Sequence, residues 1–332
     1  MIRIVLACFF SFINVFFSID AIADVKIAVI GKMKNDSFYL QAYQGCQYVA
    51  DSVKDMSCLF DGPLDFQDPR AQAHVIETAL ERDVDAILLS VTDSTFLAER
   101  VLKKIKDRGI PLVTFDSDLL KKHQSYRIAY VGTNNFDFGK ALGEYAQRYK
   151  KETGLTEVCI QTGGRTTPNL NERLKGVRFA LSGGMQTRRL EGENGWIEYE
   201  RCPFYNLGKT GQALIQLKYI LKQEKPPVFI AVAGFAQFSP NYIREVMPYR
   251  EQIQTGQQVV ISADAEEAQL EALKLGLSSV NIGQRPFEMG RYGAQLVYDI
   301  VKHQKMPQKE INYLGFYYCK IGQPNLCSLA RQ

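Results

Sequence analysis

The sequence predicts an α/β protein with two lobes, each built on a parallel sheet that has helices on both faces. Short apolar runs alternate with amphipathic stretches between residues 25 and 303, which is the pattern of βαβ units. The alternation restarts after residue 131 with a second series of similar length. The 332 residues are enough for two domains of ordinary size.

The first series of elements ends near residue 131. Asp68 before Pro69 marks a helix start, because Asp caps helix N-termini and Pro is tolerated in the first turn. Gly109 before Pro111 marks the end of another helix. Apolar periodicity then predicts strands at 25–30, 59–60, 86–89, 112–115 and 128–131, and helices at 38–53, 69–81 and 94–108.

The second series contains the remaining elements as far as residue 303. No low-complexity linker separates it from the first series, so we expect the lobes to be joined by several tight crossings. Periodicity predicts strands at 157–161, 196–199, 228–232, 259–262 and 279–282, and helices at 136–150, 169–181, 208–221, 242–247, 266–275 and 287–303.

The N-terminus indicates export. Met1-Ile2-Arg3 is a positive start, residues 4–17 are mostly apolar, and Ala21-Ile22-Ala23 is an A-x-A cleavage pattern before Asp24. These are the features of a secretory signal peptide at residues 1–23, so we expect a mature chain in the periplasm. A membrane anchor or a lipoprotein cysteine at Cys8 is a weaker alternative, because the apolar run is short and interrupted.

Removal of the signal peptide leaves six cysteines, and an even number in an exported chain favours disulfides. They could pair in 15 ways. The most local set of pairs is Cys46–Cys58, Cys159–Cys202 and Cys319–Cys327. A metal site is the alternative, but no pair has C-x-x-C spacing and the histidines are isolated. The cysteines are Cys46, Cys58, Cys159, Cys202, Cys319 and Cys327.

Charge and motifs argue against several classes of function. The formal net charge is +4, and the basic residues are scattered among acidic ones, which gives no support for nucleic-acid binding. The turn at 31–36 lacks the G-x-G-x-x-G of dinucleotide sites. Motifs of P-loops, nucleophile elbows and zincins are also missing. We therefore expect no cofactor, no metal and no catalytic residue. Asp116 and Asp264 could only formally act as paired carboxylates of a glycoside hydrolase.

Two aspartates stand at the ends of apolar runs. Asp116 ends the run 111–115, and Asp264 ends the run 259–263. Open α/β sheets bind ligands outside the carboxyl ends of their strands, so two such edges suggest two sheets that face each other across one ligand. The alternative is that each aspartate only caps the following helix.

Polar and aromatic residues follow other strand ends. Aromatic rings pack on the apolar faces of sugars, while Asp, Asn, Gln and Arg bind the hydroxyl rim. The pattern therefore suggests a sugar-like ligand, although Phe38 and Tyr39 could simply pack at a helix start. The strand-end residues are Asp36, Phe38, Tyr39, Ser90, Thr92, Asp93, Phe204, Tyr205, Asn206 and Gln284.

Residues 25–303 resemble the type I periplasmic binding proteins, in the sugar-binding branch that includes the ribose-binding protein. Asp36-Ser37-Phe38-Tyr39 followed by Gly45 is similar to that family's N-x-F-F…G entry loop. The segment 109–116 is similar to N-I-P-V-I-T-L-D, and 171–176 resembles R-x-R-x-x-G. Ala263-Asp264 corresponds to F-D, and 283–286 to A-Q-x-P.

The resemblance implies two Rossmann-like lobes that are joined by a three-crossing hinge and close on the ligand. The N-terminal lobe is expected at 24–131 plus 285–312, and the C-terminal lobe at 132–284 plus 313–332. Residues 313–332 should form an extended C-terminus that is closed by a disulfide. Ligand contacts are expected from Asp36, Phe38, Tyr39, Asp116, Ser117, Asn171, Arg173, Tyr205, Gly234, Asp264 and Gln284.

Departures from the family pattern concern the ligand. Ser117 and Asn171 stand where the family often has Arg, and Gly234 and Phe235 stand near an expected Asn. The loss of these donors argues against simple ribose. We predict a monomeric receptor that delivers a sugar-like ligand to the permease of an ABC importer. The alternative is a co-receptor of a membrane sensor kinase, as in autoinducer-2 or trimethylamine-oxide sensing.

Overall fold

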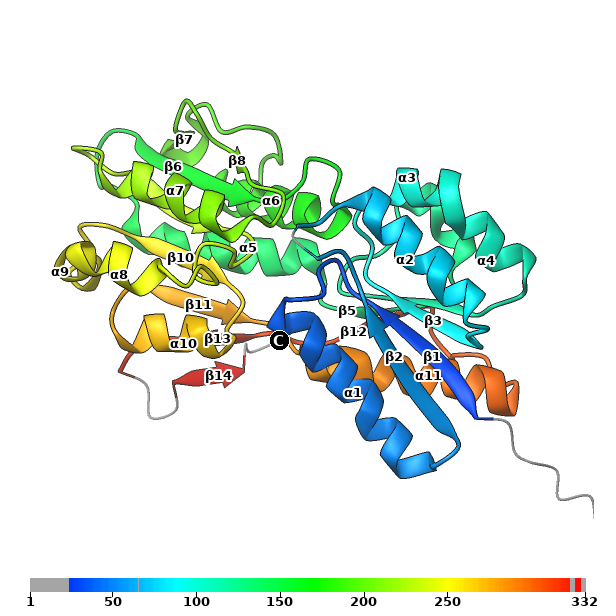
Figure 1. Ribbon diagram of the computed structural model, residues 1–332. Coiled ribbons are helices and arrows are strands. Elements are labelled where there is room, and N and C mark those ends of the chain that lie inside the picture. The colour runs from blue at the N-terminus through cyan, green and yellow to red at the C-terminus, as the bar shows by residue number, and fades with distance from the viewer. Residues whose placement is uncertain (1–23, 65, 323–325, 330–332) are drawn as a thin grey trace, which may run out of the picture.

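Two separate sheets form the framework of the molecule (Figure 1). The computed structural model describes residues 24–64, 66–322 and 326–329, so the signal peptide expected at 1–23 lies outside the described residues. The first sheet has the strand order β12-β5-β4-β3-β1-β2, and the second has the order β14-β13-β11-β10-β9-β6-β7, with β8 paired to β6. Among the strands of the described ranges, all pairs are parallel except β11–β13 and β13–β14. The predicted α/β fold with two lobes is confirmed.

The first sheet is covered by helices on both faces. Alternate side chains of β1 enter different apolar clusters: Ile27 and Val29 pack with α1 and α11, whereas Ala28 and Ile30 pack with α2 and the helix that follows β3. This period of two is that of a strand buried on both faces. The elements are β1 (Val25–Ile30), α1 (Ser37–Val53), β2 (Met56–Asp61), α2 (Pro69–Glu81), β3 (Ala86–Leu89), α3 (Ser94–Leu97), α4 (Lys103–Asp107), β4 (Leu112–Phe115), β5 (Ala129–Gly132), α11 (Pro286–His303) and β12 (Ile311–Tyr313).

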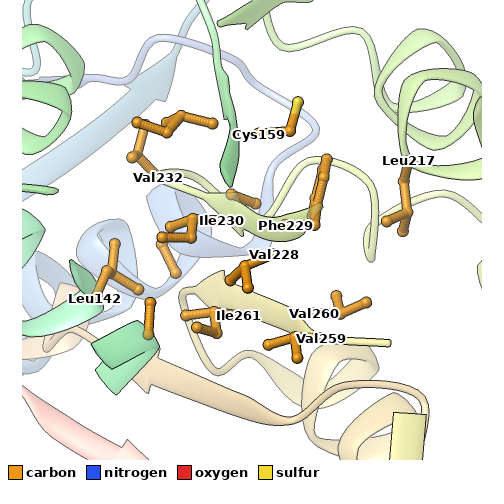
Figure 2. Close-up of a cluster of buried hydrophobic side chains, with 14 of the residues drawn as sticks. Leu142, Cys159, Leu217, Val228, Phe229, Ile230, Val232, Val259, Val260 and Ile261 are labelled. Carbon is orange, nitrogen blue, oxygen red and sulfur yellow. The ribbon is translucent and has the colours of Figure 1, made fainter. Parts of the chain in front are cut away.

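The second sheet is organised in the same way. Figure 2 shows the buried side chains around β9, with Leu142 of α5 and Leu217 of α7 on opposite sides. The elements are α5 (Asn135–Ala146), β6 (Thr156–Thr162), α6 (Pro168–Leu181), β7 (Trp196–Glu198), β8 (Phe204–Tyr205), α7 (Thr210–Leu221), β9 (Val228–Ala231), α8 (Tyr242–Val246), α9 (Arg250–Gln254), β10 (Val260–Ala263), α10 (Glu267–Lys274), β11 (Val280–Gly283), β13 (Tyr317–Cys319) and β14 (Cys327–Leu329). None of the helices in the described ranges combines the length and apolar character that a membrane crossing requires.

Three short connections join the two sheets. The chain passes from β5 to α5, from β11 to α11, and from β12 to β13, through residues 133–134, 284–285 and 314–316. The predicted three-crossing arrangement is therefore confirmed. Each sheet therefore contains strands from before and after at least one of these connections. The exact residues at which each lobe begins and ends stay a prediction.

Several element predictions need correction. The helix predicted at 136–150 is α-helical only as far as Ala146 and ends in a 3₁₀ turn. Strand β2 is longer than the predicted 59–60, because Met56 to Asp61 pair with the whole of β1. As an edge strand β2 is only partly buried, so its apolar signal is weak. The short elements β8, α9, β12, β13 and β14 were not predicted.

The disulfides follow the most local of the possible pairings. They join Cys46 to Cys58, Cys159 to Cys202, and Cys319 to Cys327. The third bridge joins β13 to β14, which agrees with the extended, disulfide-closed C-terminus expected from the sequence. Bridges of this kind persist in oxidising compartments.

Helices α5 and α6 pack at backbone contact, and this contact positions a residue of the site. A Cβ atom at Gly139 of α5 would overlap the backbone of Arg173, and one at Gly176 would overlap the backbone of Phe136. Only glycine permits so close an approach. The backbone of Arg173 is therefore fixed against α5 at the start of the second lobe.

Candidate functional site

Asp116 and Asp264 occupy equivalent places at the ends of β4 and β10. Both have left-handed backbone conformations, with φ of 56° and 68°. Their exposed fractions are 3% and 7%. Such a conformation in a residue other than Gly costs about 1–3 kcal/mol and is typical of functional sites. Glu266, not Asp264, caps α10, and Asp116 is not an N-cap of any described helix. The helix-cap alternative is therefore wrong for both.

The carboxylate of Asp116 is surrounded by donors from both lobes. Tyr39 and Ser90 donate hydrogen bonds to Oδ2 at 3.0 and 2.8 Å. Asn169 of α6 donates to Oδ1 at 3.1 Å. Two cations complete the shell: Lys32 Nζ lies 3.2 Å from Oδ2, and the Arg173 guanidinium lies 3.6 Å from Oδ1. The group is thus a charged anchor that connects the first lobe to the second.

The charges of this cluster depend on one another. Burial alone would raise the pKa of Asp116, but Lys32, Arg173 and the Ser90 hydroxyl outweigh burial and hold this pKa below its ordinary value. For Lys32 the balance is reversed: burial lowers the pKa of its ammonium group, and the attraction of Asp116 offsets this only in part. Removing either partner would leave a buried charge without compensation.

Arg173 is the central donor of the second lobe. Its exposed fraction is 2%, and its guanidinium lies over the ring of Phe138 with 4.6 Å to the centroid. It donates to Asn135 Oδ1 at 2.8 Å, to the carbonyl of Val232 at 3.0 Å and to Gln284 Oε1 at 2.8 Å. Asn135 and Gln284 lie at two of the three connections between the sheets, so Arg173 links the hinge to the site.

Asp264 is held from within the second lobe. Gln284 Nε2 donates to its Oδ1 at 2.8 Å, and the Gly234 N–H group donates to its Oδ2 at 3.3 Å. Gln284 also accepts from Arg173, which pairs with Asp116. A continuous chain of polar contacts therefore connects the two aspartates through the hinge.

A small cavity lies between the two lobes. Its volume is about 30 Å³, room for about one water molecule and well below the roughly 300–1,000 Å³ of small-molecule sites, so a ligand can enter only if the lobes separate. Charged and amide side chains share its wall with aromatic rings, which is the combination expected for a polyhydroxylated ring. The lining residues are Lys32, Asp36, Phe38, Tyr39, Gln67, Asp116, Asn169, Leu170, Arg173, Ala233, Phe235, Phe238, Asp264 and Gln284.

Two further carboxyl groups have raised pKa values. Burial raises the pKa of Asp36 to about 7, and the charges of Asp264 and Asp116 raise it further. The hydrogen bond from the Phe38 N–H group and the charge of Lys32 act in the opposite direction. Burial raises the pKa of Glu266 to about 8, with repulsion from Asp264 and Asp36 as the next causes. Acidic groups from the two lobes thus face each other, which disfavours their ionised forms.

Asp36→Asn should stabilise the protein in a pH-dependent manner. The pKa of Asp36 is raised from its ordinary 3.8 to about 7, so its contribution to stability falls as pH rises from about 4 to 7 and the penalty is complete above 7. Asn still accepts from the Phe38 N–H group as an N-cap. We expect a gain of about 1–2 kcal/mol at pH 8 and none at pH 4, by denaturant unfolding. An equal gain at both values would show that charge is not the cause.

The structure brings seven of the eleven predicted site residues to the cavity wall. Gly234 does not line the cavity but donates its N–H group to Asp264, and three others are placed elsewhere. Ser117 lies behind Asp116, where its carbonyl accepts from the Val91 N–H group. Asn171 donates to the carbonyl of Arg165, because it is two residues from Asn169 and Arg173 and so faces another side of α6. The ring of Tyr205 packs against Arg165, whose guanidinium carbon lies 4.0 Å from the centroid of the ring. None of the three is among the described residues that line the cavity.

The predicted ligand contacts omit five polar or aromatic residues of the wall, namely Lys32, Gln67, Asn169, Phe235 and Phe238, and also Ser90, which donates to Asp116 without lining the cavity. Asn169 could have been found, because it precedes Arg173 by four positions and shares its face of the helix. Ser90 was noted at a strand end but was not assigned to the site. Lys32 carries no local signal, since lysines are rarely buried. Phe238 lies in an irregular segment where periodicity is uninformative.

Comparisons with known proteins agree with this architecture. The model of the periplasmic binding protein domain family matches residues 27–305. A D-ribose/D-allose-binding protein of Pseudomonas aeruginosa is 29% identical over 179 residues, which are 52% of this chain and 55% of that protein. The match therefore spans about half the length of this curated relative.

Solved structures share the fold over nearly the whole chain. A solute-binding protein of an ABC transporter from Agrobacterium vitis, bound with α-D-tagatopyranose, has a TM-score of 0.75 at 22% identity and covers 91% of this chain and 98% of its own. One from Burkholderia graminis, in complex with D-arabinose, has a TM-score of 0.74 at 24% identity, covering 90% and 96%. Another from Agrobacterium vitis, with bound D-fucose, has a TM-score of 0.76 at 21% identity, covering 90% and 97%.

Proposed function

The chain belongs to the periplasmic binding protein family, and on this premise we propose that it is a receptor that captures a monosaccharide-like molecule between its two lobes and delivers it to an ABC importer. The observation that carries the proposal is the pair of strand-end aspartates, one from each sheet, on the wall of one cavity. A ligand that contacts both lobes favours the closed arrangement, because only that arrangement offers both sets of contacts.

The chemistry of the wall supports a sugar as ligand. Phe38 and Phe235 provide apolar surface for C–H faces, while Asp116, Asp264 and Gln284 provide acceptors and donors for hydroxyl groups. Each hydrogen bond to a charged group contributes about 1.5–3 kcal/mol. The cavity is small, about 30 Å³, so a single ring requires less separation of the lobes than a chain of rings. Tagatose, arabinose and fucose in the relatives are monosaccharides as well.

The hinge supports a receptor that opens and closes. Arg173 and Gln284 connect the site with two of the three crossings, so movement at these connections would separate Asp116 from Asp264. We propose binding without turnover, because Asp116 is kept ionised by two cations and cannot serve as a general acid. The signal peptide expected from the sequence and the disulfides support a periplasmic location.

A thermal unfolding screen of monosaccharides and polyols tests this function. A ligand that binds only the folded protein stabilises it by about 2.7 kcal/mol at 100 times its Kd. We expect at least one monosaccharide to raise the Tm by about 4 °C. Shifts with amino acids or other metabolites, but with no sugar or polyol, would contradict the proposed ligand class.

A further inference from the structure

The charges on the cavity wall do not balance. Three carboxylates line it, from Asp36, Asp116 and Asp264, against the two cations of Lys32 and Arg173. Both cations are engaged by Asp116, at 3.2 and 3.6 Å. In the part of the chain that the structure describes, neither Asp36 nor Asp264 forms an ion pair within 4.0 Å. On the side away from Asp116 the described wall thus holds two acidic groups and no cation of its own.

The unpaired carboxylates come from opposite lobes. Asp36 precedes α1 of the first lobe, and its Oδ1 accepts from the Phe38 N–H group. Asp264 follows β10 of the second lobe, and Glu266 lies two residues further on. Repulsion among these three groups is one cause of the raised pKa values of Asp36 and Glu266. Closing the lobes brings like charges together, so a positive charge between them would favour closure.

A separate observation indicates that the cavity needs a donor. Gln67 lines the wall, its exposed fraction is 6%, and its Oε1 atom has no hydrogen-bond partner among the residues that the structure describes. A buried acceptor without a partner costs about as much as a lost hydrogen bond. A ligand with an ammonium group or hydroxyls could donate a hydrogen bond to Gln67 Oε1. A ligand carboxylate could only accept hydrogen bonds, and Lys32 and Arg173 are already paired with Asp116.

The approach to the cavity is acidic as well. Phe238 lines both the cavity and an adjoining groove between α1 and α10. The groove contains the carboxyl groups of Glu266, Glu267 and Glu271, and none of the described residues that line it is Lys or Arg. A groove of one sign attracts ligands of the opposite sign. In the described residues these carboxylates do not form a cluster that could hold a metal ion.

We propose that the ligand is a cationic amino sugar, whose ammonium group is bound between Asp36 and Asp264 while its ring and hydroxyls contact Asp116 and the aromatic wall. The proposal rests on the sugar-receptor function and specifies its ligand class. Asp36 and Asp264 are the specificity residues, and Phe38 and Phe238 can add cation–π contact.

Isothermal titration with matched sugars tests this proposal. The probes are glucose, galactose and mannose, their 2-amino and 6-amino forms, their N-acetyl forms and their uronic acids. At about pH 6.5 the amines are protonated, and Asp36, with its pKa of about 7, gives up its proton when an ammonium group binds beside it. We expect an amino form to bind about 10–100 times more tightly than its neutral parent and its N-acetyl form, the size of a hydrogen bond to a charged group. Uronic acids should not bind.

Charge-neutral variants locate the ammonium group. Asp264→Asn and Asp36→Asn should each reduce the ratio of amino-form affinity to neutral-parent affinity at least about tenfold. Glu99→Gln removes one exposed carboxylate from a helix remote from the cavity and should leave the preference unchanged. An equal loss with Glu99→Gln would show a general effect of net charge and would overturn the site.

The outcomes separate the two proposals. Binding of neutral sugars with equal or weaker binding of the amino forms would overturn the amino-sugar inference and leave the receptor function intact. Binding of amino sugars with an unchanged preference in both aspartate variants would overturn the ammonium site. A lack of binding by every sugar in this panel and in the thermal screen would overturn the receptor function together with the inference.

Discussion

Replacement of Asp116 by Ala is expected to abolish ligand-induced stabilisation and to lower the stability of the ligand-free protein. Asp116 accepts from Tyr39, Ser90 and Asn169 and is the counter-charge of Lys32 and Arg173. Without it, two buried cations lose their partner. Breaking a buried ion pair in this way costs about 3–5 kcal/mol, and the ligand loses its main acceptor in the first lobe.

Denaturant unfolding and titration with the best sugar of the screen would measure both effects. The double variant Asp116→Ala/Lys32→Met is the control, because it also removes one of the abandoned charges. We expect the double variant to recover part of the stability but none of the affinity. An Asp116→Ala protein with wild-type affinity would contradict the assignment of Asp116 to the ligand.

Replacement of Arg173 by Met is expected to weaken ligand binding at least about 100-fold, because three hydrogen bonds and one ion pair to the site and hinge are lost together. The carbonyl of Val232 and the amide oxygens of Asn135 and Gln284 would lose their donor. Gln284 would then no longer be oriented toward Asp264. Met keeps much of the volume above Phe138, so the change tests polar contacts more than packing.

Two other variants separate charge from geometry at this position. Arg173→Lys keeps the positive charge but lacks the planar fork that reaches several acceptors at once, so we expect it to remain at least about tenfold weaker than wild type. Lys175→Met removes an exposed cation from the same helix and should bind normally. Normal binding by Arg173→Lys would mean that charge alone matters and that the link to the hinge does not.

The fold was predictable because both sheets are buried on two faces. Their strands appear as short, continuous apolar runs, and residues such as Asp116 and Asp264 stand out at the ends of β4 and β10. The short strands β12, β13 and β14 could not be predicted in this way. They contain two or three apolar residues each, and pairing with β5 and β11 decides their structure.

The site was predictable where one residue ends a strand or begins a helix, and not where distant segments meet. Lys32 belongs to the site because Asp116 and Asn169 approach it from other parts of the chain. Asn171 was chosen in place of Asn169 because a short motif does not indicate which face of a helix is turned to the cavity. Tyr205 was assigned by resemblance, whereas its ring packs against Arg165.

The most direct test of the central claim is a crystal structure of the protein with the sugar that stabilises it most. The ligand is expected in the cavity between the lobes, with its hydroxyls or ammonium group in hydrogen-bond contact with both Asp116 and Asp264. Phe38 or Phe235 should contact the face of the ring. A ligand that is bound elsewhere, or that contacts only one of the two aspartates, would contradict the account.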